Sequence, residues 1–162
     1  MNIKGRYVEA FGKLHLVESL LAAGFIAAEP VVDTGIDILA CNPQTGRFVP
    51  IQLKSSTKSR FTIDARYEDS VMALVWNCRN GMPEVYALTF GESQAIAQEM
   101  GYLDSPSWKK HQAYSIVPSP RLCVRLEEYR ATPDRWRALL GETYRALTLA
   151  QAPSSAPARS FY

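Results

Sequence analysis

The sequence of 162 residues has few of the side chains that bind zinc. It contains two histidines and three cysteines, and no two cysteines have the Cys-x-x-Cys spacing typical of zinc sites. A zinc site of the usual Cys and His kind is therefore not expected. The cysteines are odd in number, far apart and embedded in apolar stretches, which indicates reduced and mostly buried thiols.

Long apolar runs are also missing. No stretch approaches the roughly 18 to 20 apolar residues that a bilayer-spanning helix needs. The N-terminus has no apolar signal core behind it, because Glu9, Lys13 and Glu18 interrupt the apolar positions. The sequence therefore predicts a cytoplasmic protein without a membrane partner.

The net charge is small, at +2, so the chain as a whole is not a polycation. Any contact with nucleic acid must come from a local basic patch, because affinity for phosphate depends on the Lys and Arg groups near the strand. The length predicts one domain over residues 1–150, with a core of ordinary size. Residues 151–162 are rich in Ala, Pro and Ser, which predicts a disordered C-terminal tail.

The first regular element is a predicted amphipathic helix over residues 4–23, ended by Gly24 in a left-handed conformation. Its apolar residues recur at spacings of three and four along one stripe, namely Val8, Phe11, Leu14, Val17 and Leu21. In an amphipathic helix such a stripe faces the core.

The rest of the chain alternates between strand and helix patterns. Strands are predicted at residues 25–32 (an edge or irregular strand, because of Pro30), 36–41, 48–54, 61–67, 71–76 and 85–90. Helices are predicted at residues 92–100 and from Thr132 onward, and residues 102–120 are predicted to be irregular. The strands at 71–76 and 85–90 are continuous apolar runs, typical of strands buried on both faces.

The strands at 36–41 and 48–54 form the clearest predicted hairpin. If Asn42 and Arg47 close its loop, Asp37 faces Gln52, with the two side chains on the same side and about 5 Å apart at Cβ. Lys54 shares the face of Gln52, roughly 6.5 Å further along the strand. Buried polar groups without partners are energetically costly. The side chains of this cluster must therefore be in contact with water, hydrogen-bonded to each other, or bound to a ligand.

A divalent cation and a phosphodiester would use all three groups. Mg²⁺ or Mn²⁺ takes oxygen ligands, which Asp37 and the side-chain carbonyl of Gln52 supply. Lys54 could orient the attacking water or stabilise charge on the phosphate. An ordinary hydrogen-bonded pair of Asp37 and Gln52 is the structural alternative.

Three segments together carry a further pattern: GRYVE at residues 5–9, GIDIL at residues 35–39 and IQLKSS at residues 51–56. With the hairpin, they resemble the PD-(D/E)XK nuclease superfamily. The resemblance covers roughly residues 5–58. It implies an α/β, restriction-endonuclease-like fold, with a mixed central sheet flanked by helices and an N-terminal helix followed by the β-hairpin that carries the motif.

The resemblance also implies roles for four residues in a metal-dependent endonuclease that hydrolyses DNA phosphodiester bonds. Asp37 is the first metal ligand, Gln52 occupies the second ligand position, Lys54 is the motif lysine and Glu9 assists the metal shell. Gln52 departs from the family, which usually has Asp or Glu there. The alternatives are a catalytically inactive domain that binds nucleic acid or a protein partner, and a structural subunit of a larger complex. Glu9 could equally be an ordinary exposed glutamate.

Two pairs of basic residues are candidate phosphate contacts, namely Lys58 with Arg60, and Lys109 with Lys110. Solvated loop charge is the alternative for each pair. One domain with one site would cut both DNA strands only as a dimer or in two visits, so a homodimer or higher homo-oligomer is the expected assembly.

Overall fold

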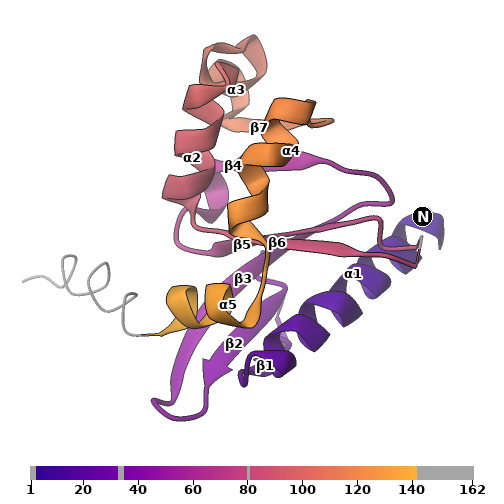
Figure 1. Cartoon of the computed structure of the whole chain (residues 1–162), viewed down its shortest axis with the longest axis vertical. Coiled ribbons are helices and arrows are strands. Elements are labelled where there is room, and N and C mark those ends of the chain that lie inside the picture. The colour runs from indigo at the N-terminus through magenta and orange to yellow at the C-terminus, as the bar shows by residue number, and fades with distance from the viewer. Residues whose placement is uncertain (1–2, 33–34, 80, 142–162) are drawn as a thin grey trace, which may run out of the picture.

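A mixed five-stranded sheet forms the centre of the protein in the computed structural model, which describes residues 3–32, 35–79 and 81–141 (Figure 1). Its strands are β1 (Ile26–Ala28), β2 (Ile38–Asn42), β3 (Arg47–Ser55), β5 (Val71–Trp76) and β6 (Glu84–Leu88). They lie in the order β1-β2-β3-β5-β6, and only the β3–β5 pair is parallel. A second, two-stranded antiparallel sheet pairs β4 (Phe61–Asp64) with β7 (Ala113–Ile116). The α/β class and the mixed sheet agree with the prediction.

The helices are α1 (Ile3–Ala22), α2 (Phe90–Glu99), α3 (Pro106–His111), α4 (Pro120–Leu126) and α5 (Pro133–Leu140). Each of α2 to α5 begins at a Ser or Thr whose side chain accepts a hydrogen bond from the backbone N–H three residues later. In α3, α4 and α5 a proline follows at the first helical position, where its missing N–H costs nothing. None of the helices in the described ranges is both long and apolar enough to cross a membrane.

The sheet separates two apolar cores. On one face, α1 and α5 bury Leu16, Leu20 and Trp136 against Ile38 and Ile51. The opposite face of β5 and β6 is covered by the β4–β7 sheet, α2 and α4, which form the upper part of the molecule in Figure 1. β5 is buried along its whole length, as its apolar run predicted, whereas the first two residues of β6 are only half-buried.

The predicted apolar stripe of α1 is confirmed only in part: Val8 and Val17 pack against the core, and the other three residues do not. The residues that pack on the sheet recur every fourth position: Gly12, Leu16 and Leu20 are buried. Gly12 allows this contact, because a Cβ there would lie 2.5 Å from the Cβ of Ser55 at the end of β3. Phe11, Leu14 and Leu21 of the predicted stripe are instead exposed on the outer side of the helix, together with Tyr7.

The hairpin forms in the predicted register. Asn42 pairs with Arg47, Cys41 with Phe48 and Leu39 with Pro50. Gly46 has a φ of +67°, which a glycine adopts without the strain a Cβ would bring. The edge strand expected at residues 25–32 is shorter, at three residues.

Two other segments differ from the prediction. The strand expected over residues 61–67 ends at Asp64, because the Asp64 carboxylate accepts the N–H of Arg66 and starts a 3₁₀ turn, Ala65–Tyr67. The segment 102–120, predicted to be irregular, contains α3 and β7. The predicted continuation of the last helix beyond residue 141, and the tail at 151–162, lie outside the described residues.

Candidate functional site

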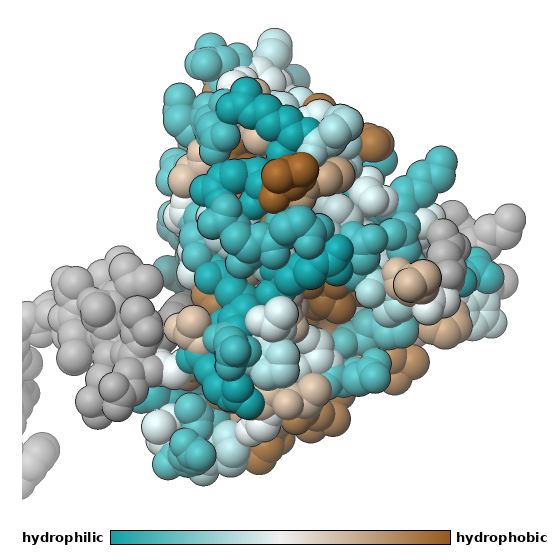
Figure 2. Space-filling model, viewed as in Figure 1, coloured by the Kyte–Doolittle hydropathy of each residue, from teal (hydrophilic) through white to brown (hydrophobic). Residues whose placement is uncertain are grey.

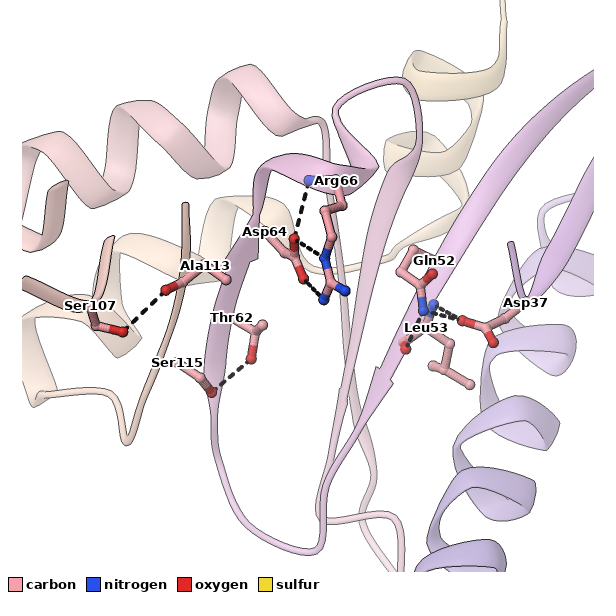
Figure 3. A network of polar contacts seen from close by, with 9 residues as sticks. All are labelled: Asp37, Gln52, Leu53, Thr62, Asp64, Arg66, Ser107, Ala113 and Ser115. Carbon is pink, nitrogen blue, oxygen red and sulfur yellow. Dashed lines mark hydrogen bonds and ion pairs between the residues drawn. The ribbon is translucent and has the colours of Figure 1, made fainter. Parts of the chain in front are cut away.

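Asp37 and Gln52 meet as the hairpin register predicted (Figure 3). Asp37 directly precedes β2, and its N–H donates to the carbonyl of Ile51 at 3.0 Å, the residue that also faces Ile38 at the end of the hairpin ladder. Gln52 lies in β3, and its Nε2 donates to Asp37 Oδ2 at 2.5 Å. Two side chains 15 residues apart in the sequence are thus joined by a short hydrogen bond across neighbouring strands.

The β3 backbone fixes both of these side chains. The N–H of Leu53 donates to Asp37 Oδ2 at 2.7 Å, so that this one oxygen accepts two hydrogen bonds. Gln52 Nε2 also donates to the carbonyl of Leu53 at 3.2 Å. These contacts hold one carboxylate oxygen and one amide nitrogen in place, and they use both amide hydrogens of Gln52.

The remaining polar atom, Gln52 Oε1, is buried and accepts no hydrogen bond within the part of the chain that the structure describes. The residue as a whole is only 6% exposed. A buried acceptor without a partner costs about 1 to 3 kcal/mol, so it is uncommon in a purely structural position. A carbonyl oxygen and a carboxylate are ligands that a hard divalent cation takes, so the residue types present fit such a cation. Oε1 lies on the side of the amide away from Asp37, so the two side chains would share a cation only after the Gln52 amide turned over.

Lys54 lies on the same face of β3 as Gln52, one pleat further on. Its Nζ is 4.7 Å from the centre of the Tyr67 ring, within cation–π range. The same ring packs against Gly35, where a Cβ would lie 3.1 Å from Tyr67 Cε1 and where φ is +81°. Tyr67 therefore links the lysine to the segment that leads into Asp37.

The carboxylate of Asp64 is also buried nearby, and it was not among the site residues predicted from the sequence. It accepts hydrogen bonds from Arg66 Nε at 3.0 Å and from Arg66 Nη2 at 2.6 Å (Figure 3). The Arg66 guanidinium, with a smaller contribution from the Lys54 charge, holds the pKa of Asp64 below its usual value. Lys54 thus lies within electrostatic reach of Asp64 as well as over Tyr67.

Glu9 is placed elsewhere. It is exposed on α1, one turn before Gly12, and it lines an open groove together with Lys13 and Glu29, which form an ion pair at 3.0 Å. No contact between Glu9 and Asp37, Gln52 or Lys54 is found among the described residues. The structure thus joins Asp37 and Gln52 directly, places Lys54 one pleat along the same face of β3, and leaves Glu9 exposed on α1.

The predicted basic residues flank the β4–β7 sheet. Lys58 and Arg60 precede β4, and both are exposed; Arg60 Nη1 lies 3.5 Å from Ser115 Oγ. Lys109 and Lys110 are exposed in the last turn of α3, directly before β7, and Lys109 pairs with Asp104 at 3.8 Å. They lie on the layer that carries Asp64, outside the Asp37–Gln52 contact.

Across residues 3–32, 35–79 and 81–141, no three His, Cys, Asp or Glu side chains lie close enough to hold a metal ion. A cation at the Asp37–Gln52 contact would take the Asp37 carboxylate together with amide, backbone and water oxygens. Comparison with models of protein families gives no match, and comparison with curated protein sequences gives none either. The functional argument consequently depends on the geometry of Asp37, Gln52 and Lys54.

Proposed function

We propose that this protein is a metal-dependent endonuclease that hydrolyses DNA phosphodiester bonds with Mg²⁺ or Mn²⁺. The observation that supports this proposal is the meeting of Asp37 and Gln52 across two strands, with the buried, unpartnered Oε1 of Gln52 and the Lys54 ammonium on the same face. The α/β architecture, in which α1 is followed by a hairpin that carries these residues, is compatible with a restriction-endonuclease-like fold. A cytoplasmic location stays a prediction of the sequence.

The cation would be held by the Asp37 carboxylate and the side-chain carbonyl of Gln52. In the present arrangement the Gln52 amide presents its nitrogen to Asp37. A half-turn of the amide would exchange nitrogen and oxygen, and two acceptor oxygens this close repel each other unless a cation lies between them. When bound, Mg²⁺ or Mn²⁺ would supply positive charge for the phosphate oxygens and a lowered pKa for water.

Lys54 would act on the phosphate. Its ammonium is a compact positive charge with three donors, suited to stabilise negative charge that develops on a phosphate oxygen. The Tyr67 ring restricts where Lys54 Nζ can lie. The surface lysines and arginines at the β4–β7 layer, Lys58, Arg60, Lys109 and Lys110, would contribute sequence-independent attraction to DNA. Glu9 would act only indirectly, from the α1 flank.

Cleavage assays with two near-isosteric variants test the proposal. Asp37→Asn removes the carboxylate charge and keeps an acceptor for the Leu53 N–H, and Lys54→Met keeps the length of the chain over Tyr67. Each is expected to lower single-turnover cleavage of duplex or branched DNA in Mn²⁺ by at least about 100-fold, the loss typical of removing one group that stabilises transition-state charge. The control Arg47→Met changes an exposed cation in the same hairpin, to which the proposal gives no role, and should retain most activity. Full activity in both site variants would refute the proposal.

A second candidate function is a domain of this fold that binds nucleic acid or a protein partner without turnover. The observation that favours it is the Gln52–Asp37 hydrogen bond, which satisfies Asp37 Oδ2 without any cation. Calorimetry separates the two candidates. The nuclease takes up Mn²⁺ with an affinity that Asp37→Asn abolishes, whereas a binding domain gives no heat with Mn²⁺ and binds DNA equally well in a chelator.

A further inference from the structure

The outer side of α1 carries a row of exposed apolar side chains. Tyr7 is 57% exposed, Phe11 41%, Leu14 64% and Leu21 57%. They lie on the side of the helix away from the buried Gly12-Leu16-Leu20 ridge, and hydrophobic atoms gather along the lower right margin of the molecule, over α1 (Figure 2). We call these four residues the α1 outer stripe. Large apolar side chains lined up in this way mark a contact surface rather than scattered surface residues.

The spacing of the stripe points to a helix as its partner. Positions 7, 11, 14, 18 and 21 are separated by four, three, four and three residues, which is the seven-residue repeat of the seam between two packed helices. Only position 18, a glutamate, is polar. The stripe runs along about 21 Å of helix at 1.5 Å per residue. A small ligand would not need such a length or such a repeat.

We propose that the α1 outer stripe binds the same stripe of a second copy of this chain, with the two helices antiparallel. A two-fold contact between identical surfaces closes on itself and leaves no unmatched stripe. The charges favour this orientation. A parallel pair would place Glu18 against Glu18, whereas an antiparallel pair centred on Leu14 separates the two glutamates by about 12 Å along the helix axis.

The groove beside the stripe extends the apolar contact. Ala10, Leu14 and Val17 line it, and its volume is about 680 Å³. Leu14 belongs to both the groove and the stripe, so it lies at the centre of the proposed contact. Because the exposed apolar surface comes mainly from one helix, the dimer is at the small end of stable interfaces and should dissociate reversibly in the micromolar range. This inference does not rest on the proposed nuclease function.

Sedimentation velocity of the full 162-residue chain across the micromolar range tests the proposal. The wild-type chain is expected to shift from monomer to dimer as concentration rises. Leu14→Glu places two charges at the centre of the contact and should raise the dimer dissociation constant at least about tenfold, equivalent to 1.4 kcal/mol. Val124→Glu is the matched control, because Val124 is a 76% exposed apolar residue on α4, outside the stripe, and its substitution should leave the constant unchanged. Circular dichroism checks that both variants keep the fold.

Two results would overturn the inference. One is a wild-type chain that stays monomeric at every concentration, which would mean that another part of the chain or an unlike protein covers the stripe. The other is a dimer that Leu14→Glu leaves intact, whatever Val124→Glu does.

Discussion

Replacing Gln52 by glutamate places a second carboxyl group where the structure has an amide nitrogen 2.5 Å from Asp37 Oδ2. Without a cation, the variant loses the hydrogen bonds that Nε2 donates to Asp37 and to the Leu53 carbonyl. It also sets two negative charges about 4 Å apart, which repel by about 4 kcal/mol at the effective dielectric constant of a partly buried site. Position 52 is too buried for water to screen much of this repulsion.

The sign of the pH dependence follows from the repulsion. The repulsion raises the pKa of the introduced carboxyl in the folded state, so the stability that depends on its proton is present in acid and is lost as pH rises through the raised pKa. The protonated carboxyl can donate to Asp37 as the amide does. With a chelator present, the free energy of unfolding is therefore expected to be about 1 kcal/mol below that of the wild type at about pH 5, because the bond to the Leu53 carbonyl is lost, and lower by up to about 4 kcal/mol more at about pH 8. Mn²⁺ should restore it at the higher pH, because the cation neutralises both carboxylates.

Urea unfolding at the two pH values, with EDTA or with Mn²⁺, measures these four stabilities. Gln44→Glu is the control, since it makes the same chemical change in the exposed loop of the same hairpin and should alter stability by no more than about 0.5 kcal/mol. A loss in Gln52→Glu that is the same at both pH values, or a gain from Mn²⁺ that Gln44→Glu shows equally, would refute the reasoning.

Two further predictions concern the supports of the site. Gly12→Ala should lower the free energy of unfolding by about 1 to 3 kcal/mol, because the added Cβ would overlap Ser55. Adding Ser55→Gly should recover most of this loss. Gly5→Ala is the control, since Gly5 lies in the same helix with open space around it and its substitution should not lower the free energy of unfolding. Asp64→Asn should lower stability at neutral pH. Because Arg66 holds the pKa of Asp64 below 3.8, the contribution of the carboxylate is complete above that value and is lost as pH falls through the lowered pKa. The difference from wild type should therefore vanish in acid, and an equal loss at both pH values would contradict it.

The hairpin and the Asp37–Gln52 contact could be predicted because they depend on local information. The loop between Asn42 and Arg47 sets the register, and strand alternation then decides which side chains share a face. The same alternation placed Lys54 beside Gln52. Each of these steps spans fewer than twenty residues of the chain.

Other features could not be predicted because more than one arrangement fits the same sequence pattern. α1 has apolar residues on two sides, and the close approach that Gly12 allows, rather than the number of apolar residues, decides that the Leu16–Leu20 side is buried. Segment 102–120, which contains three prolines, was predicted to be irregular. Next to Ser105 and Ser119 the prolines instead follow helix N-caps.

The surroundings of Lys54 could not be predicted at all. Residues 61–67 were expected to form one continuous strand, but the capping bond from Arg66 N–H to Asp64 ends the strand and turns Tyr67 over the lysine. The alternating pattern of residues 61–67 contains no signal for that contact, because it depends on how β4 lies above β3.

The most direct test of the proposed cation site is a crystal of the wild-type protein soaked in Mn²⁺, with anomalous diffraction recorded near the manganese edge. We expect one strong anomalous peak within coordination distance of Asp37 and of the Gln52 side-chain oxygen, and no such peak in Asp37→Asn crystals. A structure at saturating Mn²⁺ that has no anomalous peak between the two side chains, and in which Gln52 Nε2 still bonds to Asp37, would contradict the account.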